Sequence, residues 1–256
     1  MTRPVFLADP SLDLASLEPG ERVALGGDEG RHAATVRRIG AGEELDLADG
    51  AGVRATCVVV DAAKSGLDLE VVSVELEPEP EPRLLLVQAL AKGGRDEQAI
   101  ETCTEIGIDE VVPWQSDRAI VRWAGPKADK GRVKWESVVR AAAKQARRAR
   151  VPEVGPLVDT RALATLVRSL IDEGGRVYVC HEEATTRLSE ILADRPIGTA
   201  TALAIVVGPE GGISPDEVEA LEDAGAELVG LGRNVLRSST AGAVCATLLA
   251  AASGRM

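Results

Sequence analysis

The sequence predicts an α/β domain with a mainly parallel sheet, preceded by a small N-terminal β-barrel. From residue 83 onwards apolar strands alternate with helical segments, the pattern of a parallel sheet covered by helices. Residues 1–76 instead hold short strands separated by turn signals. Between them lies an alternating Glu-Pro segment, residues 77–82, which predicts a semi-rigid extended spacer. The predicted division is therefore a barrel over 1–76, a linker over 77–82 and a larger domain over 83–256.

The first domain is expected to be almost entirely β-structure. Turn signals such as Gly26-Gly27 and Asp49-Gly50 separate its apolar runs, and about seventy residues suffice for a small barrel. One helix, roughly 30–39, is expected to interrupt the strands. The expected strands are 23–25, 45–48, 53–60 and 67–76.

The second domain is expected to alternate regularly between strand and helix, and the Ser214, Pro215 and Glu217 side chains predict a capped helix start. The expected strands are 84–90, 110–113, 177–180, 203–207 and 227–231. The expected helices are 96–106, 128–150, 160–173, 186–193, 215–224 and 238–252.

Composition restricts the class of protein. Hydrophobic residues make up 45% of the 256 residues and aromatic residues only 2%, so the core must be aliphatic. No apolar run reaches the length of a membrane span and no signal peptide is apparent, so a cytoplasmic protein without membrane contact is expected. Four cysteines without a CxxC pair and only two histidines predict buried free thiols and no metal site.

A basic segment stands out in an acidic chain. The net charge is −12, yet residues 118–150 hold eleven Lys or Arg and two acids, a local balance of +9. Within the expected helix 128–150, residues 140, 144, 147 and 148 are spaced to share one face. This concentration of positive charge favours phosphate contacts over an ordinary solvated helix face.

A glycine loop, residues 208–212, follows the apolar strand 203–207 and precedes a helix. Loops at the carboxyl ends of strands are where open α/β sheets bind nucleotide-like ligands. The spacing matches neither GxGxxG nor a P-loop, and Glu210 would repel a phosphate. A positively charged ligand fits better than a phosphate, although a tight turn without a ligand is the alternative.

Two further loops follow strands in the same way. Residues 230–241 again form a strand, glycine turn and helix start, with Arg237 at the rim and Ser238 or Ser239 able to cap the helix. Residues 181–183, His-Glu-Glu, follow strand 177–180, where His181 could be a base or a capped surface residue. Two glycine loops after neighbouring strands favour a ligand site.

Taken in order, these segments resemble the RsmE family of 16S rRNA methyltransferases, of the SPOUT class. The resemblance covers nearly the whole chain and rests on the order of its motifs. In the second domain they are the GPEGGIS of 208–214 with Glu217, the LGRNVLR of 231–237 with Thr240 and Ala241, the AAKQARR of 142–148 with Val151 and Pro152, and the TEIGI of 104–108 with Val112 and Pro113. In the first domain they are Arg3, Phe6, His32 and the VRR of 36–38.

The resemblance implies a fold and an activity. The first domain would be a PUA-like RNA-binding β-barrel, and the second a SPOUT methyltransferase domain whose C-terminal part forms a trefoil knot. The enzyme would be a homodimer that methylates N3 of a uridine in 16S rRNA or the small ribosomal subunit, with S-adenosyl-L-methionine as cofactor. Three positions differ from the residues common in the family. Many members have Arg where Asn234 stands, Glu where Ser239 stands and Lys where Thr102 stands.

Residue roles follow from the motifs. Arg237 is expected to stabilise negative charge on the uracil oxygens, and Glu210 to orient the cofactor or accept a proton through water. The expected cofactor-binding residues are Cys180, His181, Glu182, Val207, Gly208, Pro209, Gly211, Gly212, Leu231, Gly232, Leu236 and Ser238. The expected RNA-binding residues are Arg3, His32, Arg37, Arg38, Arg140, Lys144, Arg147 and Arg148.

Three alternative functions predict different ligands. A non-catalytic RNA-binding assembly factor would need the basic segment but no glycine loops. A small-molecule NAD or nucleotide enzyme would have no use for residues 118–150. A SPOUT methyltransferase acting on another RNA position would share every motif.

Overall fold

The computed structural model describes residues 3–256, which divide into two compact units. Of these residues, the first unit comprises 3–79 with 143–151, and the second comprises 80–142 with 152–256. The segment 143–151 therefore packs with the first unit, whereas the sequence assigned it to the second. The reason is apolar packing: Ala149 is buried in a cluster with Val5, Leu7 and Ala48 of the first unit.

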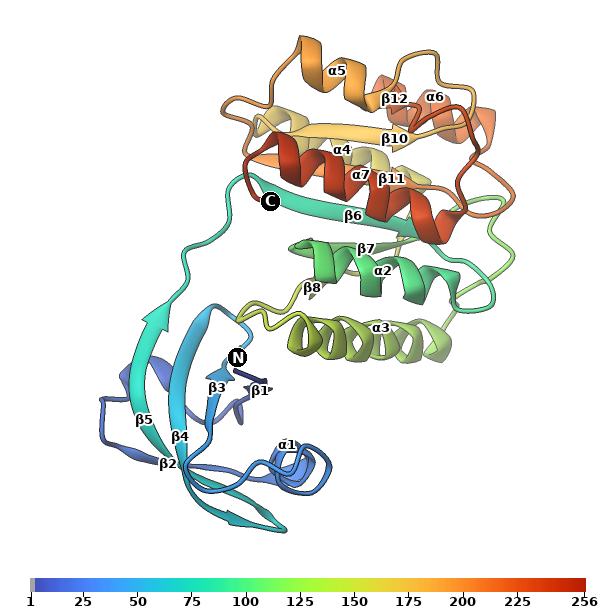
Figure 1. Cartoon of the computed structure of the whole chain (residues 1–256). Coiled ribbons are helices and arrows are strands. Elements are labelled where there is room, and N and C mark those ends of the chain that lie inside the picture. Colours follow the sequence, from blue (N-terminus) through green and yellow to red (C-terminus); the bar gives the residue numbers. More distant parts are fainter. Residues whose placement is uncertain (1–2) are drawn as a thin grey trace. The chain divides into compact units, whose positions relative to one another are not determined.

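The first unit is a five-stranded β-sheet with a mainly aliphatic core (Figure 1). Its order is β1-β3-β4-β5-β2, antiparallel except for the parallel pair β1 and β3. Register shifts at Thr56/Cys57 and Val59/Asp61 bend the long hairpin of β4 and β5. Its elements are β1 (Val5–Leu7), η1 (Leu14–Ser16), β2 (Arg22–Leu25), α1 (Gly27–Arg31), η2 (His32–Val36), β3 (Glu44–Ala48), β4 (Val53–Ala63) and β5 (Gly66–Leu76).

The second unit is a parallel sheet of order β12-β10-β11-β6-β7-β8, with β9 also pairing with β7. This confirms the predicted α/β class. Its strands are β6 (Arg83–Ala89), β7 (Glu110–Gln115), β8 (Glu153–Val154), β9 (Val158–Asp159), β10 (Arg176–Cys180), β11 (Ala202–Val207) and β12 (Glu227–Val229). Its helices are α2 (Arg95–Ile106), α3 (Pro126–Gln145), α4 (Thr160–Asp172), α5 (Leu188–Asp194), α6 (Pro215–Asp223) and α7 (Ser238–Ala252).

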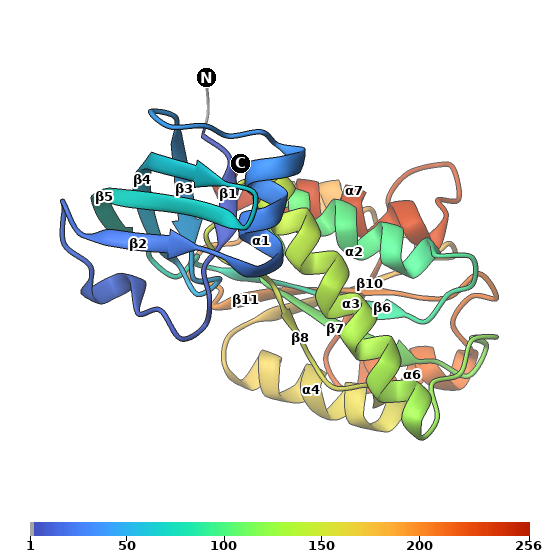
Figure 2. The same ribbon diagram turned by 90° about the horizontal axis from the view of Figure 1, so that it is seen from below.

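Helices cover both faces of this sheet. Helices α2 and α7 pack together on one face, and α4 and α6 lie on the other (Figure 2). The strands between them are buried on both sides, which explains why β11 reads as an unbroken apolar run. Close packing of α7 depends on Gly242, because a Cβ there would lie 3.1 Å from Leu86 Cδ1.

The predicted long helix 128–150 is wrong at its C-terminal end. Helix α3 stops at Gln145, and Arg147 adopts a left-handed conformation with φ of 60°. The Arg147 N–H donates to the Lys144 carbonyl, and the Arg148 N–H to the Ala143 carbonyl, which is the Schellman arrangement. Glycine usually occupies the left-handed position, so an arginine there concealed the helix end. Arg147 and Arg148 consequently do not continue the helix face of Arg140 and Lys144.

The predicted buried thiols are confirmed for Cys57, Cys103 and Cys245, whereas Cys180 is half-buried. Burial, and secondarily the Asp46 charge, raises the pKa of the Cys57 thiol to about 11. Burial, and secondarily the charge of Cys180, raises the pKa of the Cys103 thiol to about 12. These core thiols therefore stay protonated at neutral pH.

Candidate functional site

The carboxyl ends of the parallel strands surround a cavity of about 900 Å³ in the second unit. Its wall consists of the loops after β7, β10, β11 and β12, together with one face of α6 and the starts of α2 and α7. A smaller cavity of about 250 Å³ adjoins it and shares the Cys180–Glu182 segment and Leu236. This is the edge of the sheet at which α/β folds bind ligands.

The glycine loop forms one wall of the large cavity, and its shape requires glycine. A Cβ on Gly208 would lie 2.6 Å from Ile213 Cγ1, and one on Gly211 would lie 3.1 Å from the Arg118 carbonyl oxygen. Gly212 has a left-handed φ of 75°. The loop ends at Ser214, whose hydroxyl accepts the Glu217 N–H and so begins helix α6 with the predicted capping box.

Glu210 points from this loop to an arginine that the sequence analysis did not single out. Arg95 Nη1 lies 2.8 Å from Glu210 Oε1. Partial burial raises the pKa of Glu210, but hydrogen bonds from the backbone and Arg95 outweigh it and lower the pKa overall. A carboxylate stabilised in its ionised form is a weak proton acceptor. The geometry therefore favours an orienting role for Glu210 over the alternative role as a base.

The loop before α7 and the loop after β10 hold each other in place. The Gly230 N–H donates to the Thr186 carbonyl at 2.9 Å, and the Leu188 N–H donates to the Gly230 carbonyl at 3.0 Å. His181 Nδ1 accepts the Glu183 N–H at 3.2 Å. Two of the predicted loops thus form one continuous wall.

The start of α7 opens onto the cavity without a side-chain cap. The N-cap residue is Arg237, so the expected capping by Ser238 or Ser239 is wrong. Ser238 Oγ is buried and has no hydrogen-bond partner within residues 3–256. Arg237 is exposed and lines the cavity. An unpartnered hydroxyl at a helix N-terminus is suited to a polar ligand group.

Every residue predicted to bind cofactor lies on one of the two cavities. Arg237 and Glu210 line the large one. Of the predicted cofactor-binding residues, Leu231 and Gly232 line only the smaller cavity, and the remaining ten line the large cavity. Two arginines of the cavity, Arg95 and Arg118, were not predicted from the sequence, although Gly93-Gly94 after β6 is a further glycine turn that could have indicated Arg95. Residues 3–256 contain no group of three His, Cys, Asp or Glu arranged to hold a metal ion.

The cavity fits S-adenosylmethionine chemically. Part of its lining is apolar and consists of Val207, Leu236 and Ala241. Two acidic residues of the lining, Glu182 and Glu210, supply the negative charge that a cationic ligand requires. Arginines at the rim and the N-terminus of α7 suit an anionic group.

Comparison with known families identifies the class of protein. A family model described as "RNA methyltransferase domain" matches residues 77–250, and one described as "RNA methyltransferase PUA domain" matches residues 25–72. The chain belongs to this RNA methyltransferase family.

Individual relatives match this chain over most of their length and belong to the same kind of enzyme by name. Ribosomal RNA small subunit methyltransferase E of Mycobacterium bovis is 48% identical over 227 residues, 89% of this chain and 85% of the relative. The structure of the enzyme of that name from Neisseria gonorrhoeae, bound to S-adenosyl methionine, covers 98% of both chains with a TM-score of 0.82 at 24% identity. A Legionella pneumophila methyltransferase structure with bound SAM has a TM-score of 0.79 at 25% identity, covering 98% of this chain and 97% of that one.

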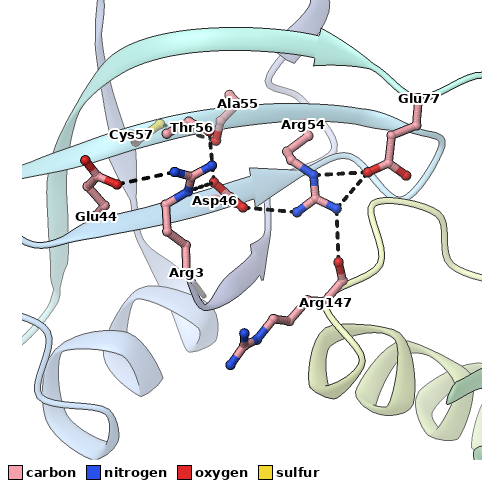
Figure 3. A network of polar contacts seen from close by, with 9 residues as sticks. All are labelled: Arg3, Glu44, Asp46, Arg54, Ala55, Thr56, Cys57, Glu77 and Arg147. Atoms are coloured by element: carbon pink, nitrogen blue, oxygen red, sulfur yellow. Dashed lines mark hydrogen bonds and ion pairs between the residues drawn. The ribbon is translucent and has the colours of Figure 1, made fainter. Parts of the chain in front are cut away.

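In the first unit of this RNA methyltransferase, Arg3 and Lys144 are engaged in ion pairs. Arg3 Nε lies 2.8 Å from Asp46 Oδ1, and Arg54 approaches the other oxygen of the same carboxylate at 3.1 Å (Figure 3). Lys144 Nζ lies 2.6 Å from Glu29 Oε1. RNA contact by Arg3 and Lys144 therefore requires sharing or breaking these pairs.

The other predicted RNA-binding residues differ in exposure. His32, Arg37, Arg38, Arg140 and Arg147 are exposed and Arg148 is half-buried. Arg38 is also left-handed, with φ of 56°. Contact with RNA remains a prediction for all eight residues.

The conformation of Arg147 yields a first prediction. Its carbonyl accepts a hydrogen bond from Arg54 Nη2 at 3.0 Å, which holds the left-handed turn (Figure 3). Because glycine adopts this conformation without strain, Arg147→Gly should leave the free energy of unfolding unchanged or raise it by up to about 1 kcal/mol. RNA affinity should fall because a cation is lost. Chemical denaturation and RNA titration of the same preparation measure both.

Gln145→Gly is the matched control, since Gln145 is the last residue of α3 and is exposed. It should cost about 1 kcal/mol of stability and leave RNA affinity unchanged. Unchanged RNA affinity in Arg147→Gly would remove Arg147 from the RNA-binding surface.

Proposed function

We propose that this chain transfers the methyl group of S-adenosylmethionine to N3 of a uridine in the rRNA of the small ribosomal subunit. The observation that carries the proposal is the large cavity, where the predicted catalytic and cofactor residues of three separate loops meet. The name and the 48% identity of the mycobacterial relative support the substrate class. Ribosomal RNA as substrate implies action in the cytoplasm.

Bound S-adenosylmethionine supplies an electrophilic methyl group. Uracil N3 carries a proton at neutral pH, so this proton must pass to solvent water as the N3–methyl bond forms and the methyl–sulfur bond breaks. Arg237, exposed at the cavity rim, would stabilise the negative charge that develops on the uracil oxygens. The Glu210–Arg95 pair would fix the glycine loop against the cofactor. Much of the rate would come from positioning.

The proposal includes a trefoil knot in the C-terminal part of the second domain and a homodimer formed through α7. Within α7, a mainly apolar face is half-buried and lies away from the buried residues of the helix; it consists of Ala243, Val244, Thr247 and Leu248. Such a face is suited to a second copy of the helix. Sedimentation of the purified protein measures the oligomeric state, and a monomer at micromolar concentration would contradict the dimer.

Two experiments test the activity. Calorimetric titration with S-adenosylmethionine should give saturable binding, whereas a non-catalytic assembly factor would give none. Mass spectrometry of small-subunit rRNA from a deletion strain should reveal one uridine that has lost its N3 methyl group. Loss of a different modification would favour a methyltransferase for another RNA position.

Salt dependence provides a second prediction. If the basic residues contact phosphates, the logarithm of the RNA association constant should fall linearly with the logarithm of salt concentration, by about 0.7–0.9 per phosphate contacted. Six contacts would weaken binding roughly thousandfold between 50 and 200 mM salt. Filter binding at a series of salt concentrations measures this slope, and a flat response would exclude the basic segment from RNA binding.

A further inference from the structure

The loop between β7 and α3 adds a wall to the cavity that none of the sequence motifs indicated. Arg118 of this loop lines the large cavity and is exposed. We propose that Arg118 binds a phosphate of the RNA strand at the mouth of the cavity and so guides the target nucleotide into it. This inference rests on the proposed function.

The position of Arg118 is fixed by contacts with the glycine loop. Its Nη1 lies 3.4 Å from the carbonyl oxygens of both Gly211 and Ile213. The close approach of the two backbones, which leaves no room for a Cβ on Gly211, holds the arginine beside the loop. Arg118 therefore lies on the exposed wall of the cavity, next to the residues predicted to bind the cofactor.

The loop itself is held by a network of hydrogen bonds. Glu217 Oε1 accepts the Asp117 N–H at 2.8 Å, and Arg122 Nη2 donates to the Asp117 carbonyl at 2.7 Å. Gln115 bonds the Val121 carbonyl at 2.9 Å and the Trp123 N–H at 3.0 Å. A loop ordered in advance loses little entropy when its arginine binds a ligand.

Arg118 also lacks a carboxylate partner. Arg95, on the same cavity, is paired with Glu210, whereas no Asp or Glu within the described residues forms an ion pair with Arg118. The neighbouring Asp117 directs Oδ2 to Ser214 Oγ, 3.4 Å away. The guanidinium is thus available to an anion from outside the protein.

The position of Arg118 in the basic segment favours RNA over the carboxylate of the cofactor. Arg118 is the first cation of residues 118–150 and the only one of them that lines the large cavity. Arg122, Lys127 and Lys130 follow it, all exposed and without an ion pair inside residues 3–256. Farther along α3, Arg132 pairs with Glu136 and Lys134 with Glu97. The unpaired cations therefore begin at the cavity and continue along the chain.

The test uses the full-length protein and small-subunit rRNA purified from a deletion strain. Arg118→Ala should weaken RNA binding by roughly tenfold or more, which corresponds to about 1.4 kcal/mol. It should also reduce the salt slope by about 0.7–0.9, the contribution of one phosphate contact. The dissociation constant for S-adenosylmethionine should remain within about twofold of the wild-type value. Arg118→Lys should keep the salt slope, because it keeps the charge.

Arg168→Ala is the matched control. Arg168 is an exposed arginine of α4 in the same unit, without a polar side-chain contact in the described chain and outside both cavities. Wild-type RNA affinity and salt slope in Arg118→Ala would overturn the inference. So would weakened cofactor binding with an unchanged salt slope, because the cofactor carboxylate would then be the anion. If the wild-type enzyme itself fails to methylate the rRNA, the proposed function is at fault.

Discussion

Arg237→Ala is expected to lower the rate of methyl transfer by about 10²–10³-fold while S-adenosylmethionine still binds. Arg237 precedes the first turn of α7 with an extended backbone, φ −68° and ψ 154°, and lines the large cavity. Its side chain has no hydrogen-bond partner within residues 3–256, so its removal leaves no buried group unsatisfied. The loss should therefore appear in the chemical step and leave protein stability unchanged.

Single-turnover kinetics with saturating rRNA and cofactor separate this step from binding. Arg237→Lys should recover part of the rate, because it retains a positive charge but not the planar pair of donors. Arg168→Ala, on α4, should react at the wild-type rate. An Arg237→Ala enzyme with the wild-type single-turnover rate would exclude a catalytic role, and loss of cofactor binding would make Arg237 a binding residue instead.

Local sequence signals predicted the parts of this site that depend on neighbouring residues. The capping box of α6 was predictable because Ser214 and Glu217 act within one turn of chain. Strand β11 was predictable because burial on both faces requires an unbroken apolar run. The positions of the loops after β10, β11 and β12 then followed from parallel strands ending at one edge.

Contacts between distant segments could not be predicted in this way. Arg95 and Glu210 are 115 residues apart, and Arg118 lies 93 residues before Gly211. Neither arginine belongs to a local pattern that distinguishes it from a surface cation. Likewise the end of α3 was hidden because an arginine, not a glycine, occupies the left-handed position at residue 147.

Glu217 combines a local role that was predicted with a tertiary role that was not. The residue is 1% exposed and forms no ion pair in the described part of the chain. One oxygen accepts the Ser214 N–H at 3.0 Å. The other accepts the Asp117 N–H at 2.8 Å and the Thr160 hydroxyl at 2.7 Å. Glu217 therefore joins the glycine loop, the loop that carries Arg118 and the start of α4.

Glu217→Ala is consequently expected to lower the free energy of unfolding by about 3–5 kcal/mol, because it removes the acceptor of two partly buried N–H groups and opens a cavity in place of a buried side chain. Glu217→Gln should cost less, about 1–3 kcal/mol, since an amide keeps the shape but offers one accepting oxygen. Urea denaturation measures both. Asp216→Ala is the control, because Asp216 is an exposed acid in the same first turn and should cost at most about 1 kcal/mol.

The folded Glu217→Gln protein also tests whether the same carboxylate positions the site. Its RNA affinity should fall toward that of Arg118→Ala, because the single amide oxygen cannot accept both the Asp117 N–H and the Ser214 N–H, and losing either bond separates the glycine loop from the loop that presents Arg118. Combining Glu217→Gln with Arg118→Ala should then weaken RNA binding little more than Arg118→Ala alone, since both changes remove one contact. Fully additive losses would mean that Glu217 supports stability without positioning Arg118.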